Sequence, residues 1–143
     1  MDEAYVFCKK FNYDNKEKGE FCFTITTRRL LDLKVNDSLH CDVTHKLVWN
    51  GFPVTVIART DKNRRTHLVM IGVSTSEAEE DSYFMLASWK NVDKDLFFSY
   101  IMADAAEAMV NAAKRLWPHI KRLMCYAHVY MVKEKKKFTP LFF

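Results

Sequence analysis

Glycine and proline are scarce in this chain, whose 143 residues include 3 of each. The glycines (Gly19, Gly51 and Gly72) are too few and too scattered for a Walker loop or a dinucleotide-binding turn. The sequence therefore argues against kinase and nicotinamide chemistry. Since 49% of the residues are hydrophobic, it also argues against a low-complexity chain and predicts one ordered domain.

Long apolar runs and regularly spaced cysteines are missing as well. No run reaches the roughly 20 residues that a membrane-spanning helix needs, so no membrane association is expected. The first residues are acidic where a secretory signal would be basic. Free thiols in a reducing, intracellular compartment are expected for the four cysteines, which are Cys8, Cys22, Cys41 and Cys125.

An excess of one charge is also lacking, since 22 Lys and Arg stand against 18 Asp and Glu for a net charge of +4. This mild basicity is compatible with a nucleic-acid partner and does not require one. The basic residues fall in short clusters, and each cluster alone fits ordinary solvated surface better than a binding site. The longest of them is the run from Lys133 to Lys137.

What the chain does contain is a periodic pattern that predicts a mixed α/β domain with the element order β-β-β-α-β-α-β. The predicted strands cover 39–44, 54–60, 66–73, 95–103 and 120–126, and the predicted helices cover 77–89 and 106–117. In the N-terminal extension, 12–19 resembles a turn between two short extended pieces, and a strand is plausible over 20–26. Ser76 is expected to cap the first helix, and Pro118 to end the second. The first three strands are expected to form an antiparallel meander, to which the crossovers add parallel strands. The result is a mixed five-stranded sheet with flanking helices.

Two acids occupy unusual places in these strands. Asp42 lies within an otherwise apolar strand, and Asp104 closes another. If the two strands are parallel neighbours, both carboxylates lie at the same end of the sheet, where they could hold divalent ions. Two Mg²⁺ ions about 4 Å apart can activate a water or a 3′-hydroxyl and stabilise the leaving oxygen. The alternative is structural, with Asp42 ending a strand and Asp104 capping a helix.

Histidine and cysteine offer weaker candidates for a metal site. Cys125 and His128 form a C-x-x-H element, but a structural zinc site needs four ligands and no second pair matches it. His40, His45 and His67 lie near strand ends, where single histidines are common. For both groups, a structural role without metal is the simpler interpretation from the residues alone.

Two segments resemble the MULE (Mutator-like) transposase domain. The first, LHCDVTHKLVWNGFPVTVIARTDKNRRTHLVMIGVSTSEAEEDSYFML, has an Asp-x-Thr-(Tyr or His)-Lys-Leu strand and a Gly-x-Pro turn. A hairpin and a Ser-x-Glu-x-x-x-(Asp or Glu)-(Tyr or Phe) helix follow. The second, IMADAAEAMVNAAKRLWPHIKRLMCYAHV, has the family's block of Asp, Ala-(Met or Leu), Asn-Ala, (Phe or Trp)-Pro and C-x-x-H. The order and spacing of these motifs agree over about residues 20–132.

This resemblance implies an RNase H-like fold with three carboxylates of the DDE type. Asp42 matches the family's first acid and Asp104 the second, while Cys125 and His128 match the C-x-x-H element that follows. The implied cofactor is Mg²⁺ or Mn²⁺, bound by Asp42 and Asp104. The implied partners are transposon-end and target DNA, and the implied location is the nucleus. The reaction would be DNA cleavage followed by strand transfer.

The chain departs from the family pattern after the C-x-x-H element. The third acid of the family lies well beyond that element, and Glu134, within the lysine run, follows too soon to replace it. We therefore expect an N-terminal extension (1–38), a partial core (39–137) and a tail (138–143). Such a core, cut short at its C-terminus, is expected to be inactive by itself, and whether the chain is an enzyme stays open.

Other functions remain open at this stage. One is a non-enzymatic, domesticated transposase-derived protein with a DNA-binding or regulatory role. Another is a different RNase H-like nuclease, against which the lack of an acid other than Glu134 after the last strand counts. If the final helix of the domain is absent, one sheet face should expose apolar residues and favour association, including homo-oligomers.

Overall fold

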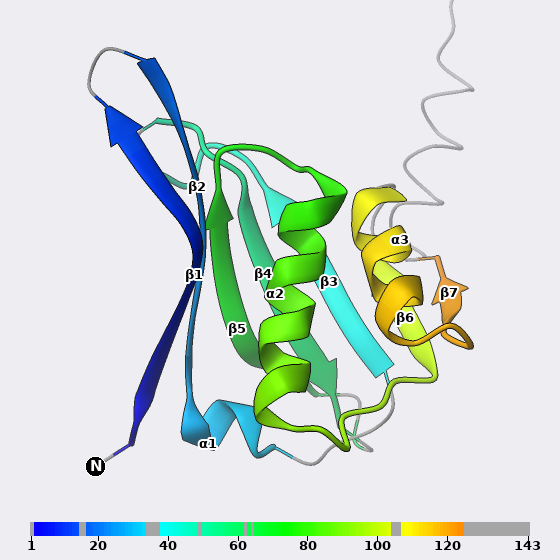
Figure 1. The fold of residues 1–143 in the computed structure, drawn as a ribbon. Helices are drawn as coiled ribbons and strands as arrows, with labels where there is room; N and C mark the ends of the chain where they lie inside the picture. Colours follow the sequence, from blue (N-terminus) through cyan, green and yellow to red (C-terminus); the bar gives the residue numbers. More distant parts are fainter. Residues whose placement is uncertain are drawn as a thin grey trace, which may run out of the picture.

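In the described part of the chain, one mixed sheet of seven strands runs in the order β1-β2-β5-β4-β3-β6-β7 (Figure 1). The computed structural model describes residues 2–14, 17–33, 38–48, 50–61, 63, 65–103 and 107–124. The strands are β1 (Ala4–Asp14), β2 (Glu17–Thr27), β3 (Ser38–Thr44), β4 (Val54–Thr60), β5 (Thr66–Ser74), β6 (Tyr100–Ala103) and β7 (Lys121–Leu123). The helices are α1 (Arg28–Leu31), α2 (Glu79–Val92) and α3 (Glu107–Leu116).

The centre of the sheet agrees with the sequence. Strands β3, β4 and β5 form the predicted antiparallel meander, and β6 and β7 extend the sheet beyond β3 as parallel strands. The mixed α/β class is therefore confirmed. The plausible strand over 20–26 lies within β2. The sheet nevertheless has seven strands and not the predicted five, because the N-terminal extension contributes the long hairpin β1–β2, whose second strand pairs with β5.

One predicted strand is much shorter than expected. Strand β6 begins at Tyr100, so residues 95–99 of the predicted strand belong to the connection after α2. There, the backbone N–H of Leu96 donates to the carbonyl oxygen of Asp93 at 3.2 Å. The carbonyl of Leu96 in turn accepts the indole N–H of Trp117 at 2.9 Å. These bonds fix a turn in apolar residues that would otherwise suit a buried strand.

The start of α2 also differs from the prediction. Ala78 is the N-cap residue, and no side chain caps the helix. The hydroxyl of Ser76 instead donates to the carboxylate of Asp81 at 3.1 Å. Ser76 is therefore not the cap, because the helix begins at Glu79 and the Ser76 hydroxyl bonds to Asp81 in the first turn.

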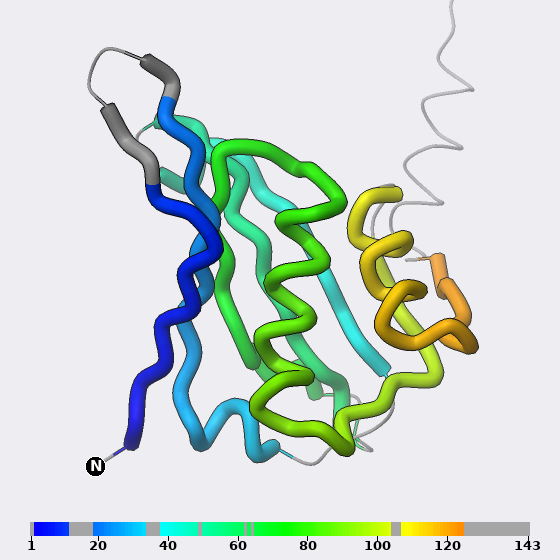
Figure 2. The backbone as a smooth tube through the Cα atoms, viewed as in Figure 1, coloured from blue at the N-terminus to red at the C-terminus, as the bar shows by residue number. Residues whose placement is uncertain are grey.

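Helices α2 and α3 lie side by side on one face of the sheet, which we call the covered face (Figures 1 and 2). Strand residues such as Leu39 and Ile57 are fully buried beneath them. The aromatic rings of Trp89, Phe98 and Trp117 meet edge to face, with centroids 5.3 and 5.0 Å apart. Burial of each large apolar side chain contributes about 1.5–3 kcal/mol, so this face holds most of the stability.

Among the described residues, no helix covers the opposite face of the sheet, which we call the open face. Its side chains alternate along each strand with those of the covered face. Several apolar ones remain exposed, including Ile25 (48%), Leu68 (41%) and Ile71 (37%). The described part of the molecule thus has the exposed apolar sheet face that the sequence led us to expect. None of the described helices is both long and apolar enough to cross a membrane.

Candidate active site at the end of strand β3

Asp42 lies on the open face of β3, between β4 and β6. Its neighbours Cys41 and Val43 point to the covered face, where Cys41 is 6% exposed and Val43 lines a small cavity under α2. Because side chains alternate along a strand, Asp42 points the other way, and it is exposed. The sequence predicted an acid within an apolar strand. The structure adds that its side chain projects from the open face and not toward the helices.

The strands that carry the two candidate acids are parallel neighbours. Their register runs from Ser38 opposite Tyr100 to Cys41 opposite Ala103. Asp42 is the next residue of β3. Asp104 is the next residue of the chain after Ala103, and it lies outside the described residues. The condition that the sequence analysis set, parallel neighbouring strands that end at one edge, is therefore met by β3 and β6.

Asp42 has apolar surroundings on the open face. In the sheet ladders, Asp42 lies opposite Val56, Val56 opposite Ile71, and Ile71 opposite Ile25. From β2 to β6, Asp42 is the one charged side chain that the described residues place on this face. A carboxylate that projects from an apolar surface is available for a cation or a hydrogen-bond donor brought by another molecule or segment.

His40 is the second polar group on this face, two residues before Asp42. Its Nε2 atom lies 2.7 Å from the hydroxyl of Thr60 on β4. Partial burial lowers the pKa of His40 from its ordinary value of 6.5, so the imidazole is neutral at pH 7. A neutral imidazole next to the acid adds no positive charge that would compete with a metal ion.

The three histidines singled out in the sequence do not converge. His45 forms an ion pair with Glu77, and His67 lies 2.9 Å from the carboxylate of Asp61. Within the residues that the structure describes, no three His, Cys, Asp or Glu side chains are grouped so that they could hold a metal ion. Cys125 and His128 of the C-x-x-H element lie outside those residues.

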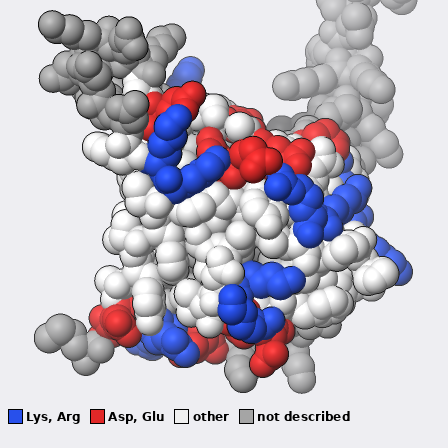
Figure 3. Space-filling view, in the orientation of Figure 1, with Lys and Arg blue, Asp and Glu red and all other residues white. Residues whose placement is uncertain are grey.

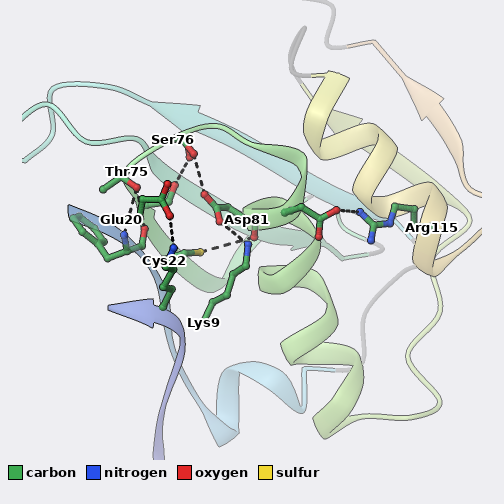
Figure 4. A network of polar contacts seen from close by, with 11 residues as sticks. Lys9, Glu20, Cys22, Thr75, Ser76, Asp81 and Arg115 are labelled. Atoms are coloured by element: carbon green, nitrogen blue, oxygen red, sulfur yellow. Dashed lines mark hydrogen bonds and ion pairs between the residues drawn. The ribbon is translucent and has the colours of Figure 1, made fainter. Parts of the chain in front are cut away.

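A polar network that the sequence analysis missed surrounds the start of α2 (Figure 4). Asp81 is its centre: one carboxylate oxygen accepts from Lys9 at 3.0 Å and the other from Ser76 at 3.1 Å. The thiol of Cys22 donates to the backbone carbonyl of Asp81 at 4.0 Å. Burial, with the nearby Asp81 charge, raises the pKa of Cys22 to about 12, so this thiol stays protonated.

This network lies at the same end of the sheet as Asp42 but on the covered face. A cavity of about 10 Å³, the size of one water molecule, separates the end of β3 from α2 and α3. Arg115 of α3 bonds to Glu79 and Glu80 of α2 at 3.2 and 2.6 Å. Acidic and basic side chains alternate along this rim (Figure 3). These bonds within the chain therefore connect α2 with α3 and with the β1–β2 hairpin.

The comparison with known families decides the family to which this chain belongs. The model of the MULE transposase domain matches residues 38–132, which is more than half of the chain. The chain belongs to the MULE transposase domain family. No curated protein and no solved structure matches it.

The MULE match begins at the first residue of β3 and takes in both candidate acids and the C-x-x-H element. The resemblance read from the sequence is thereby confirmed. Membership in this family connects the chain with transposition and, in general, with DNA. Strands β1 and β2 lie outside the matched region, although they belong to the same sheet.

Proposed function

We propose that this chain forms the part of a MULE transposase core that supplies the first two of three catalytic carboxylates, Asp42 and Asp104. The observation that carries this proposal is the parallel pairing of β3 with β6, whose register ends one residue before each acid. In this proposal the fold is RNase H-like, with β1 and β2 added at one edge of the sheet.

The donor atoms fit the metal that the family implies. Carboxylate oxygens are the hard ligands that Mg²⁺ and Mn²⁺ prefer, and Asp42 is exposed on a face where the described side chains from β2 to β6 include no competing cation. When bound, such ions lower the cost of attack by water or a 3′-hydroxyl on a DNA phosphate. Asp42 would hold a metal from the strand, and neutral His40 would leave the local charge negative.

The open face suggests how the site is completed. It is apolar and offers few cations, so DNA phosphates have little to bind on it directly. We propose that the segment bearing the third carboxylate lies outside the described residues and covers this face beside Asp42. A two-metal site without one of its three carboxylates loses most of its activity, because charge and geometry both fail. By the family's function, the site of action would be nuclear DNA.

The test is Mn²⁺ binding, followed by electron paramagnetic resonance of the free ion. We expect weak binding by the unaltered chain and its loss in Asp42→Ala and in Asp104→Ala, since each change removes a ligand. Asp95→Ala is the matched control, because this exposed acid lies in the connection before β6, away from the end of β3. It should leave Mn²⁺ binding unchanged.

Other results would point elsewhere. Equal Mn²⁺ binding by all variants would contradict a metal pair at these acids and favour the non-enzymatic, domesticated descendant. Binding that needs Glu134 would favour a different RNase H-like nuclease. If both aspartates are required, the same variants should also abolish strand transfer in the presence of Mg²⁺.

A further inference from the structure

Strand β1 forms one edge of the sheet, and its first half lacks the features that usually protect an edge. The strand order places β2 on one side of β1 and no described strand on the other (Figure 1). From Ala4 to Cys8, the strand is uncharged, has no proline and pairs with β2 without a register shift. Exposed edges are usually blunted by charges, proline or bulges, because bare edges pair with other strands.

The hydrogen bonds of β1 show which backbone groups face outward. The N–H of Arg28 donates to the carbonyl oxygen of Glu3 at 2.8 Å, so Glu3 directs its backbone groups toward the β2 side. In an antiparallel ladder, successive residues direct their N–H and C=O groups alternately to the two sides. The backbone groups of Ala4, Val6 and Cys8 therefore point away from the sheet.

We propose that this edge is an interface with a second copy of the chain, in which the two β1 strands pair antiparallel around a two-fold axis at Val6. Outward-facing residues then meet outward-facing residues: Val6 lies opposite Val6 of the second copy, and Ala4 lies opposite Cys8. Both sheets continue into one another with their open faces on the same side. The Val6 side chain, 65% exposed in one copy, is covered by its equivalent.

Charge and side-chain type favour this self-pairing. The register places Tyr5 opposite Phe7. Just beyond the regular ladder it brings Glu3 near Lys9 of the second copy, whose ammonium also bonds to Asp81 of its own chain. Opposite charges and aromatic pairs across antiparallel strands are both stabilising. A register centred on Cys8 would instead bring the irregularity that follows Cys8 into the interface and leave Glu3 without a base opposite. The acidic start and basic middle of the strand thus make it complementary to itself.

The first experiment separates the edge from the open face, using light scattering after size exclusion. Val6 and Ile25 lie opposite each other on the open face, but only Val6 lies on the edge strand. We expect a dimer for the unaltered chain and for Ile25→Lys. Val6→Lys places two ammonium groups at the axis and should raise the dimer Kd about tenfold or more. Circular dichroism confirms that both variants remain folded.

Two results would overturn the proposal. One is a monomeric unaltered chain at every concentration tested. The other is a dimer that Ile25→Lys abolishes while Val6→Lys does not, because that outcome would assign the interface to the open face.

The second experiment tests the register by disulfide formation under mild oxidation. Ala4→Cys should link to Cys8 of the second copy, giving covalent dimers whose 4–8 linkage is mapped by mass spectrometry. The control Ala4→Cys with Cys8→Ser should stay uncrosslinked. A Cys8–Cys8 linkage in the unaltered chain would place the axis elsewhere and contradict the register.

Discussion

The covered and open faces of the sheet are built from the same strands and differ in what those strands present. On the covered face, Ile57, Met70 and Leu39 are almost fully buried under α2 and α3. On the open face, Ile71 and Ile25 of the same sheet remain 37% and 48% exposed, in the row that leads to Asp42.

The two faces of the sheet therefore have different roles: the covered face contributes stability, and the open face carries the candidate acid Asp42. The covered face has its hydrophobic and polar partners within the chain, including the network around Asp81 (Figure 4). The open face has an acid and an apolar surface that no described helix covers. An exposed apolar surface around a single carboxylate is typical of a face that another segment or molecule completes.

The largest expected effect comes from one substitution made on both faces. Ile57→Ala removes a side chain that is 0% exposed and should lower the free energy of unfolding by about 3 kcal/mol, through lost burial and a cavity. Ile71→Ala, on the neighbouring strand, should cost about 1 kcal/mol, because this side chain is already partly in water. Urea unfolding of both variants measures the difference. Equal losses would show that the open face is covered in solution.

An intermediate loss of stability is expected for a substitution where β5 packs against α2. A Cβ atom at Gly72 would lie 2.5 Å from Sδ and 2.7 Å from Cε of Met85, a buried side chain. Gly72→Ala should therefore cost about 1–3 kcal/mol through overpacking. In the double variant with Met85→Ala, the cost should be less than the sum of the single costs, since the smaller side chain leaves room.

Gly51 provides the matched control for this comparison of single and double variants. It has φ +68° and no atom within 4 Å of an added Cβ, so Gly51→Ala should cost about 1 kcal/mol through backbone strain alone. Met85→Ala should not relieve that cost. Strict additivity at Gly72 would mean that β5 and α2 do not pack as closely as described.

The smallest expected effect is on the pH dependence of stability, through His40 on the open face. Burial lowers its pKa in the folded protein below the 6.5 of the unfolded chain, so the unfolded state takes up the proton first as the pH falls. The stabilising contribution of neutral His40 is complete above pH 6.5 and is lost as the pH drops through 6.5 toward the lowered pKa. His40→Gln should reduce this loss in urea unfolding between pH 7.5 and 5.5.

An unchanged slope in His40→Gln would contradict the assigned burial, and would mean that the imidazole is fully hydrated beside Thr60.

The central strands and the place of Asp42 could be predicted from the sequence because their signals are local. Strand β4 has the predicted bounds, since β-branched and apolar residues fill it between two turns. The wrong predictions involve residues whose partners are distant in sequence. The β1–β2 hairpin joins the sheet through β5, and residues 95–99 are kept from the strand by bonds that include Trp117.

The sequence by itself determined the class of the fold, the order of the elements from β3 to β7 and the acid-bearing motif that marks the family, because alternation and short motifs are properties of neighbouring residues. Only the tertiary structure decided that Asp42 faces the uncovered side, that β3 and β6 are adjacent, and that β1 is an edge. These features depend on strand pairing between distant segments, and a one-residue change of register would move every side chain of a strand to the other face.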